Sequence, residues 1–284
     1  MGSAMATRLA GQGAQVLVFN RTPSRAEDLA GRIGARVADT AAQAAAESDI
    51  VITMVADEEA VIGLYRQPGG VLEGLSPRTV AVDMSTVLPD TVRSLEVDVG
   101  RTGAGLLDAP VSGSVPLVEA GTLTIMVGGE ADDLERARPV FEAMSRRIFH
   151  MGSLGAGATI KLAVNDIVFA LGGALAEALV LAEKAGVDRA LAYDVFIDSA
   201  IGAPFVGYKR DAYVDPDHAP VGFSVDLARK DLGLILELSR RVGADMPQAE
   251  VNLAQLDQTA DGLGGDRDFA AVAERLRRGR AGMA

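Results

Sequence analysis

One lysine is prominent for its position and its rarity. Lys161 follows a glycine-spaced stretch in GSLGAGATIKLAVND (152–166), and the 284-residue chain has only four lysines, the rest of its positive charge being arginine. Arginine keeps its proton near neutral pH, whereas a lysine can release it where its surroundings disfavour the ammonium. Asn165 follows four residues later, which puts both side chains on one face of a helix. The lysine therefore predicts a site of acid–base chemistry.

Lys161 and a second lysine, Lys230, also have an alternative interpretation in which their role is only structural. For Lys161 it is a side chain that reaches solvent at a helix start, although a cation there faces the unfavourable end of the helix dipole. For Lys230, in ARKDLGL (228–234), it is a position on the solvated face of an amphipathic helix. We expect Asp166 and Asp231 to be structural, as helix caps or salt-bridge partners.

The composition excludes several classes of protein. An apolar share of 49% is typical of a globular protein with a sizeable core. The formal net charge of −12 argues against binding to nucleic acid or to an anionic membrane, since both attract basic surfaces. We expect no apolar run of the roughly 18 residues that a spanning helix needs, and no signal leader. The absence of cysteine excludes disulfides and thiol catalysis and fits a cytoplasmic protein.

The two histidines give no metal-binding pattern. His150 and His218 are far apart in the chain and belong to no HxxH or HExxH motif. We therefore expect no histidine-based metal site, and we place both side chains in loops or on the surface.

Strands and helices alternate in the first half of the chain. Runs of Val and Ile bounded by Gly, Asp or Pro predict short buried strands of a parallel sheet at 15–20, 49–57, 79–85 and 122–129. Helical patterns lie between them at 24–34 and 42–48. This alternation predicts an α/β, Rossmann-like doubly wound domain.

The second half has no strand pattern. Residues 156–186 predict one long buried helix ending at Gly186, and further helices are predicted at 192–200, 227–243 and 270–278. We therefore expect a dinucleotide-binding domain over 1–155 and an all-helical substrate and dimerisation domain over 156–284. A helix that is apolar on most sides needs neighbours on those sides, so we expect a homodimer or a higher homo-oligomer.

The chain opens with small residues, a helix and a strand, MGSAMATRLAGQGAQVLVFNRT. This order matches the later part of a dinucleotide-binding unit, in which a strand and G-x-G-x-x-G precede the helix. Of that motif only Gly2 is present, so we expect the sequence to begin inside it, without the first strand and two glycines. The alternative is an ordinary helix start with Gly2 and Ser3 as caps.

The end of the second strand bears on the choice of cofactor. NAD sites usually have an acidic residue there that binds the ribose 2′-hydroxyl. Here the strand ends in Asn20, Arg21 and Thr22, and the Arg21 guanidinium could pair with a 2′-phosphate. This favours NADP over NAD. The alternative for Arg21 is a solvated arginine in a turn.

Four motifs in order make the resemblance to a family specific. DAPVSGS (108–114), EAGTLTIMVGG (119–129), GSLGAGATIKLAVND and ARKDLGL resemble the β-hydroxyacid dehydrogenase family over nearly the whole chain. The family includes 3-hydroxyisobutyrate dehydrogenases, tartronate semialdehyde reductases and glyoxylate/succinic semialdehyde reductases. The resemblance implies a nicotinamide-dependent oxidoreductase that acts on a small carboxylate substrate.

The resemblance also implies roles for individual residues. Lys161 matches the catalytic lysine, and Asn165 matches the asparagine that helps to hold the substrate. The residues implied in substrate carboxylate binding are Ser112, Gly113 and Ser114. The residues implied in cofactor binding are Gly2, Asn20, Arg21, Thr22, Val55, Ala56, Thr86 and Lys230.

The sequence departs from the family pattern beside the implied carboxylate site. Ser114 stands where a second glycine is usual, and 116–118 replaces a Gly-Ala pair. These departures concern the choice of substrate more than the chemistry.

Three other functions stay open. Imine reductases share this fold and cofactor domain but commonly have another residue in place of Lys161. 6-Phosphogluconate dehydrogenases share it too, but the acidic chain shows no basic cluster suited to a sugar phosphate. A non-catalytic scaffold is the third alternative. The function we expect is reduction of a semialdehyde, or oxidation of a 3-hydroxy acid, in which Lys161 exchanges the proton with the reacting oxygen.

Overall fold

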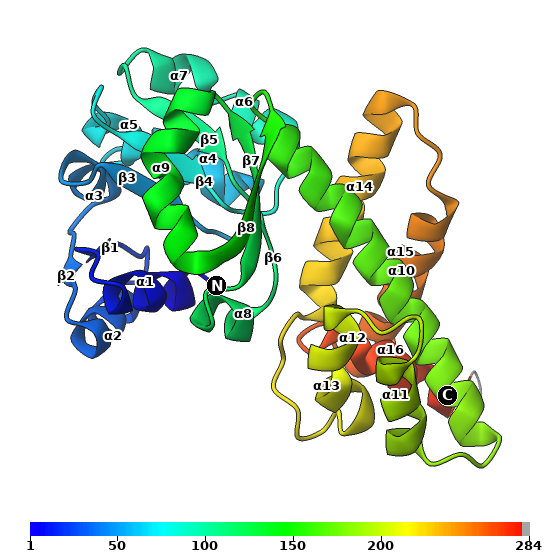
Figure 1. Ribbon diagram of the computed structural model, residues 1–284. Coiled ribbons are helices and arrows are strands. Elements are labelled where there is room, and N and C mark those ends of the chain that lie inside the picture. Colours follow the sequence, from blue (N-terminus) through cyan, green and yellow to red (C-terminus); the bar gives the residue numbers. More distant parts are fainter. Residues whose placement is uncertain (280–284) are drawn as a thin grey trace. The chain divides into compact units, whose positions relative to one another are not determined.

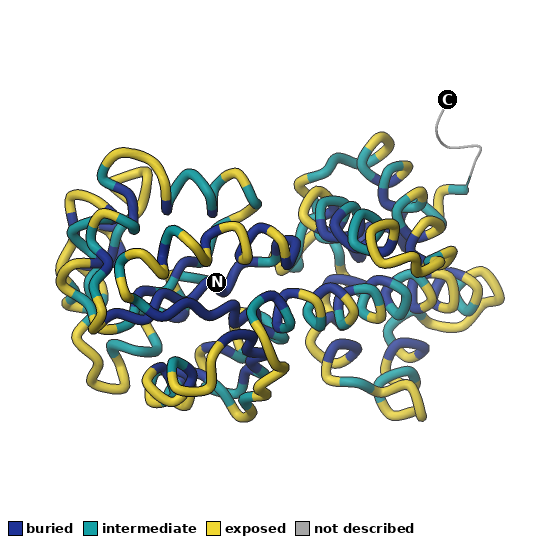
Figure 2. The backbone as a smooth tube through the Cα atoms, turned by 90° about the horizontal axis from the view of Figure 1, so that it is seen from above, coloured by how far each residue is buried: buried dark blue, intermediate teal, exposed yellow. Residues whose placement is uncertain are grey.

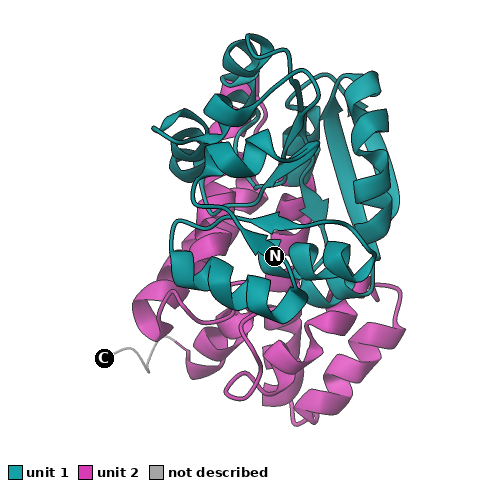
Figure 3. Cartoon of the chain, turned by 90° about the vertical axis from the view of Figure 1, so that its left-hand side faces the viewer, with its two compact units in different colours: residues 1–161 teal, residues 162–284 magenta. Residues whose placement is uncertain are grey.

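A computed structural model describes residues 1–279 of the chain (Figure 1). The chain forms two compact units, residues 1–161 and 162–284 (Figure 3). Among the described residues, the first unit contains all the strands and the second is helical. This arrangement confirms the predicted fold class, an α/β Rossmann-like domain followed by an all-α domain. The division between the units falls inside a long helix, at Lys161, whereas the functional boundary near residue 155 stays a prediction.

Unit 1 contains eight strands. They are β1 (Leu17–Val18), β2 (Arg36–Val37), β3 (Ile50–Thr53), β4 (Val80–Asp83), β5 (Gly105–Asp108), β6 (Val111–Ser112), β7 (Leu123–Gly129) and β8 (Ser145–Gly152). All four strands predicted from the sequence are present, as β1, β3, β4 and β7. The sequence interpretation missed the other four.

The helices of unit 1 connect these strands. They are α1 (Gly2–Gly11), α2 (Pro23–Ile33), α3 (Ala41–Ala46), α4 (Glu58–Arg66), α5 (Val71–Gly74), α6 (Pro89–Arg93), α7 (Glu96–Gly100), α8 (Val115–Glu119) and α9 (Ala131–Met144). Their ends follow local chemistry. Asp57 caps α4 by accepting a 2.8 Å hydrogen bond from the Ala60 N–H, and α2 ends at Gly34 with a φ of 68°.

The main sheet has the order β3-β4-β5-β7-β6, and β8, off this path, also pairs with β7. β3, β4 and β5 are parallel and in register, so that Thr53, Asp83 and Asp108 end the three strands in one row. β7 runs antiparallel to β5 and β6. The expectation of a parallel sheet is therefore wrong for the pairing of β7 with β5 and β6, because the β6–β7 connection, which holds only the short α8, turns the chain back on itself. β7 is parallel to β8.

β1 and β2 form a separate parallel pair. Within residues 1–279, no backbone hydrogen bond joins β1 to β3. In the doubly wound order 3-2-1-4-5-6, the first strand lies between the second and the fourth.

The sheet is buried on both faces. Val80 and Val82 of β4 pack into a cluster with α1, α8 and α9, whereas Ala81 packs into a cluster with α3 to α7. Side chains of a strand alternate between faces, so each helix layer covers one set. All residues of β4 and β5 are buried, and Figure 2 shows the buried and exposed parts of the backbone.

Unit 2 is built from helices. They are the greater part of α10 (Ala156–Lys184), then α11 (Arg189–Asp198), α12 (Pro204–Tyr208), α13 (Arg210–Val214), α14 (Val225–Val242), α15 (Pro247–Leu263), the 3-10 helix η1 (Phe269–Ala271) and α16 (Val272–Arg278). α10 is the predicted long helix, and it ends two residues before Gly186. α14 matches the helix predicted over 227–243 and is capped by Ser224.

α10 is not buried all round. Ile167 and Leu181 are 69% and 72% exposed and lie on one stripe of the helix with Ala163, Ala174 and Ala178. By length and composition alone, α10 also passes as a candidate membrane span. The expectation that the chain has no spanning helix stays a prediction for α10. The indication is weak, because the core helix of a soluble protein passes the same test.

Candidate active site

Two loops at the carboxyl edge of the parallel strands contain predicted cofactor residues. Val55 and Ala56 directly follow β3, and Thr86 follows β4. The Val55 N–H donates a 3.0 Å hydrogen bond to Ser85 Oγ, which ties the loop after β3 to the loop after β4. In open α/β sheets, ligands bind beyond the carboxyl ends of the strands. The placement of these residues fits a dinucleotide.

The other cofactor residues predicted in unit 1 belong to α1 and to the end of β1. A Cβ atom on Gly2 would lie 3.6 Å from the Cβ of Met54, so the start of α1 contacts the end of β3. Asn20 Oδ1 accepts a 2.8 Å hydrogen bond from the Thr22 N–H and closes a turn after β1. Arg21 in that turn is exposed and forms no ion pair with any residue in 1–279.

The predicted carboxylate-binding residues lie where β6 leads into α8. Ser112 ends β6, and Gly113 has a φ of 139°, where a Cβ would approach a leucine side chain to 2.7 Å. Ser114 precedes α8 but its side chain makes no cap bond. The Ser114 Oγ atom is buried and has no hydrogen-bond partner in the described part of the chain. The unusual segment 116–118 belongs to α8.

Asp108, the last residue of β5, fixes the start of α10. Its Oδ1 accepts a 2.7 Å hydrogen bond from the Gly155 N–H, and its Oδ2 accepts a 2.6 Å bond from the Ala158 N–H. Burial raises the pKa of Asp108, while these N–H groups and the charge of Arg93 act in the opposite direction. An anion stabilises the unpaired N–H groups of a helix start. Lys161 lies one turn further along α10.

The glycines before Lys161 serve this junction. Gly152 and Gly155 have φ angles of 114° and 89°, which favour glycine. Gly157 is helical, and a Cβ there would lie 2.3 Å from the carbonyl oxygen of Met126. The glycine spacing thus lets the first turn of α10 pack directly on β7. That these glycines also let the backbone pass close to the substrate stays a prediction.

The two lysines and the asparagine are placed by two helices. Lys161 is half-buried on α10, and Asn165 is buried one turn later on the same face. The Asn165 Nδ2 atom donates a 2.7 Å hydrogen bond to Asp231 Oδ2 on α14. The other carboxylate oxygen of Asp231 pairs with Lys230 Nζ at 2.8 Å. One buried carboxylate thus connects Asn165 and Lys230.

We expected Asp166 and Asp231 to be helix caps or salt-bridge partners, and the structure differs for the two residues. Asp231 is the salt-bridge partner of Lys230, but its bond to Asn165 was missed, because the two residues are far apart in sequence. Asp166 forms no ion pair within residues 1–279. Its Oδ1 is buried without a hydrogen bond, and burial raises the pKa of Asp166. The prediction is therefore wrong for Asp166.

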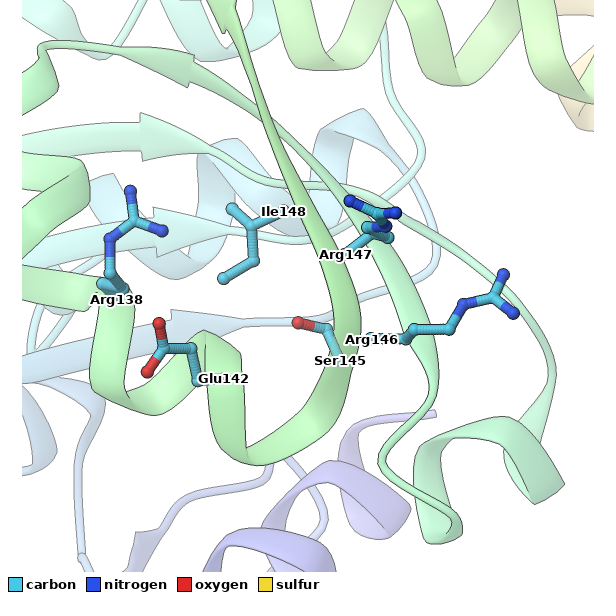
Figure 4. Close-up of a pocket in the computed structure, with 6 residues that line it drawn as sticks. All are labelled: Arg138, Glu142, Ser145, Arg146, Arg147 and Ile148. Carbon is cyan, nitrogen blue, oxygen red and sulfur yellow. The ribbon is translucent and has the colours of Figure 1, made fainter.

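A shallow hollow of about 240 Å³ lies on α9 and β8 and contains none of the predicted site residues (Figure 4). Its lining includes three arginines, Arg138, Arg146 and Arg147, with Glu142 beside them. The fold thus gathers a small basic cluster that the sequence interpretation did not foresee. Arg138 is already paired with Glu135.

The histidines take part in local hydrogen bonds. His150 Nε2 lies 2.8 Å from the carbonyl oxygen of Gly129, and His218 Nδ1 lies 2.8 Å from Asp215 Oδ1. Both histidines are exposed, as predicted, and His150 lies on β8.

Family comparisons cover both units. The NAD binding domain of 6-phosphogluconate dehydrogenase matches residues 1–152. The NAD-binding domain of NADP-dependent 3-hydroxyisobutyrate dehydrogenase matches residues 155–276. The class of protein is therefore a two-part NAD(P)-dependent oxidoreductase.

Individual relatives narrow the class. The chain is 37% identical to a 3-hydroxyisobutyrate dehydrogenase of Pseudomonas aeruginosa, over 99% of this chain and 96% of the relative. It is 34% identical to an NAD-dependent L-serine dehydrogenase of the same organism, over 96% and 93%. A solved structure of Mycobacterium tuberculosis 3-hydroxyisobutyrate dehydrogenase with L-serine has a TM-score of 0.83 at 35% identity, over 98% and 96%. The chain belongs to the β-hydroxyacid dehydrogenase family, as its motifs indicated.

Proposed function

We propose that the chain is an NADP-preferring oxidoreductase that interconverts a small 3-hydroxy acid and its semialdehyde, with Lys161 as the general acid and base. The observation that carries the proposal is the placement of Lys161 and Asn165 on one face of α10. Asp108 fixes the start of this helix and Asp231 fixes Asn165. An acid–base residue must be held in one geometry to act, and this helix provides it.

The proposed chemistry follows from charge. The nicotinamide supplies or accepts the hydride when it is bound. In reduction, negative charge develops on the carbonyl oxygen, and the Lys161 ammonium stabilises that charge and gives the oxygen a proton. In oxidation, the neutral Lys161 amine takes the proton of the hydroxyl group. Asn165 donates to or accepts from the substrate beside the lysine.

The substrate carboxylate is assigned to Ser112, Gly113 and Ser114. The buried Ser114 Oγ supports this assignment, because a buried hydroxyl without a partner costs about 1–3 kcal/mol that a bound carboxylate would recover. The names of the relatives, which act on 3-hydroxyisobutyrate or L-serine, also indicate a small hydroxy acid. Gly113 has a φ of 139°, which favours glycine, and the backbone N–H groups of such a turn are suited to bind an anion.

The cofactor assignment rests on the loops of unit 1. Gly2, Val55, Ala56 and Thr86 line the carboxyl edge of the sheet, and the turn of Asn20, Arg21 and Thr22 ends β1. The exposed guanidinium of Arg21 supports a preference for the 2′-phosphate of NADP over NAD. Lys230 is assigned to the cofactor from unit 2, where its pairing with Asp231 holds it.

The proposal extends to the assembly. We assign residues 1–155 to cofactor binding and 156–284 to substrate binding and dimerisation, in a soluble cytoplasmic homodimer. The exposed stripe of α10 supports the dimer, since a second copy of the same stripe would cover its alanines, Ile167 and Leu181. Neither nucleic acid nor membrane is assigned as a partner.

Lys161→Ala tests the function most directly. With a panel of short semialdehydes and 3-hydroxy acids, kcat should fall about 10²-fold to 10⁴-fold while the Kd for NADPH stays within about twofold. Lys184→Ala, at the exposed end of the same helix, is the matched control and should retain full activity. Near-normal turnover of Lys161→Ala would reject the mechanism. Absence of NADPH binding by the wild type would favour the scaffold alternative, and reduction of imines alone would favour the imine reductase.

A further inference from the structure

The three parallel strands of unit 1 end in a row of polar residues. Thr53 of β3, Asp83 of β4 and Asp108 of β5 are direct neighbours in the sheet register. All three side chains are buried, with exposed fractions of 3% or less. Asp108 holds the start of α10, as described above. No role has so far been given to Thr53 or Asp83.

Asp83 accepts hydrogen bonds from the last residue of β3 and from Ser85 in the loop after β4. The Thr53 hydroxyl donates to Asp83 Oδ2. Ser85 donates twice, from its N–H to Asp83 Oδ1 over 3.0 Å and from its hydroxyl to Oδ2 over 3.3 Å. The Ser85 oxygen in turn accepts the Val55 N–H. A continuous chain of bonds therefore runs from the Asp83 carboxylate to the backbone of the loop after β3.

We propose that Asp83 is a positioning residue, which holds the loops after β3 and β4 in the conformation that binds the nicotinamide cofactor. This inference rests on the proposed function, which puts Val55, Ala56 and Thr86 along the cofactor. Asp83 itself is buried behind the loops and acts through Ser85 and Thr53.

The buried position of Asp83 is energetically unfavourable for a carboxyl group that served only to fill space. Burial raises its pKa to about 6, although the bonds from Thr53 and Ser85 act in the opposite direction. The groups that face it are Thr53 from β3, Tyr65 from α4 and Asp108 from β5, and the negative charge of Asp108 adds to the rise. A carboxyl group in such surroundings is retained where its acceptor atoms are needed.

The hydrogen bonds of the Asp83 side chain are also not needed for strand pairing in the sheet. The strand pairing of β3, β4 and β5 is complete through the backbone. The side-chain bonds of Asp83 leave β4 and reach Thr53, the last residue of β3, and Ser85 in the loop after β4. Ser85 in turn binds Val55 in the loop after β3. Loss of these bonds should therefore loosen the loops before it weakens the sheet.

Ser85→Ala and Asp83→Asn test the assignment. Ser85→Ala removes the acceptor of the Val55 N–H, and Asp83→Asn puts an NH₂ group where Oδ2 accepts two hydroxyls. Each should raise the Kd for NADPH, measured by fluorescence titration, about fivefold to tenfold, the size expected for one hydrogen bond. Each should also speed hydrogen exchange of the Val55 amide. The kcat at saturating cofactor should change less than about twofold.

Ser76→Ala is the matched control. Ser76 Oγ lies 3.2 Å from Thr79 Oγ1 near the opposite end of the same strand, so this variant removes a similar bond away from the loops. Its Kd for NADPH and its Val55 exchange should equal those of the wild type. If Asp83→Asn does not fold, Ser85→Ala, which loses a single hydroxyl, carries the test.

The outcomes separate this assignment from the proposed function. Wild-type protein that binds NADPH, with Ser85→Ala binding it equally well, overturns the role of Asp83 and leaves the function intact. Wild-type protein that does not bind a nicotinamide cofactor overturns both. A rise in Kd that Ser76→Ala shares equally also overturns the assignment, because the effect would then be general destabilisation.

Discussion

Asn165 on α10 and Asp231 on α14 are joined by a hydrogen bond of 2.7 Å between buried atoms. Asp231 is 2% exposed and Asn165 is 7% exposed, so water does not compete for this bond. The same carboxylate pairs with Lys230. Asp231 therefore fixes the orientation of the asparagine proposed to hold the substrate and of the lysine proposed to contact the cofactor.

Asp231→Ala should lower the free energy of unfolding by about 2–4 kcal/mol, because it leaves the Asn165 amide and the Lys230 ammonium without their shared partner. Urea denaturation measures this loss. Glu237→Ala on the same helix removes an exposed i,i+4 pair with Arg241 and should change stability by less than about 0.5 kcal/mol. Equal effects of the two variants would contradict the importance of the Asn165–Asp231 bond.

Arg21→Ser should raise the KM for NADPH at least about tenfold and leave the KM for NADH within about twofold. The reason is that only NADPH has the 2′-phosphate that a guanidinium binds with charge-assisted bonds. Steady-state kinetics with both cofactors provide the measurement, and Arg32→Ser on α2 is the control. A wild-type enzyme that already prefers NADH would refute the assignment of Arg21.

Gly157→Ala should lower the free energy of unfolding by about 1–3 kcal/mol, since its methyl group would lie 2.3 Å from the Met126 carbonyl oxygen. Gly63→Ala is the matched variant, because Gly63 lies within α4 and has nothing near its Cβ position. That substitution should instead stabilise the protein by about 0.5–1 kcal/mol. Thermal unfolding of the pair distinguishes close packing from general intolerance of alanine.

Asp83 should make stability depend on pH in a defined window. Its pKa in the folded chain is about 6, above the ordinary value of 3.8, so its contribution to stability is complete below about pH 4 and is lost as the pH rises through 6. The unfolding free energy of the wild type should therefore fall relative to Asp83→Asn by about 3 kcal/mol between these pH values. Asp49→Asn, at an exposed position before β3, should not reproduce this slope.

Leu181→Glu combined with Ile167→Glu should convert the proposed dimer to a monomer, because each charge would be buried against a second copy. Light scattering should give twice 29.4 kDa for the wild type and 29.4 kDa for the double variant. Val97→Glu is the control, since Val97 is 63% exposed on α7 of unit 1 and lies outside the stripe. A monomeric wild type would contradict the dimer.

The elements that the sequence predicted are those whose pattern is local. β3, β4 and β7 are short apolar runs rich in Val and Ile, and α10 is a long apolar run. The hydrophobic pattern of the sequence is therefore enough to identify them. β5 was missed because its residues, Gly105–Asp108, include no Val or Ile, the residues by which the other strands were recognised. β8 was missed because it is an edge strand rich in arginine, with mostly exposed residues. The antiparallel direction of β7 depends on turns whose geometry its own residues do not show.

The residues of the candidate site also separate into those that the local sequence predicts and those that only the fold reveals. Lys161 and Asn165 were predictable because their spacing of four residues already places them together. Asp231 was expected only as a structural residue and Asp83 was not identified, since a buried acid in the sequence looks the same as an exposed one. Their importance arises from partners that only the fold brings near, Asn165 for Asp231 and Thr53 for Asp83.

The outer edge of β8 has a consequence for the protein at high concentration. Within residues 1–279 this strand pairs only with β7, and Phe149 and Met151 are exposed along it. Such an edge is a template onto which another molecule can add a strand. Arg146 and Arg147 on the same strand would meet their own counterparts in an approaching copy. Their mutual repulsion works against strand-by-strand growth and helps to keep the enzyme dispersed.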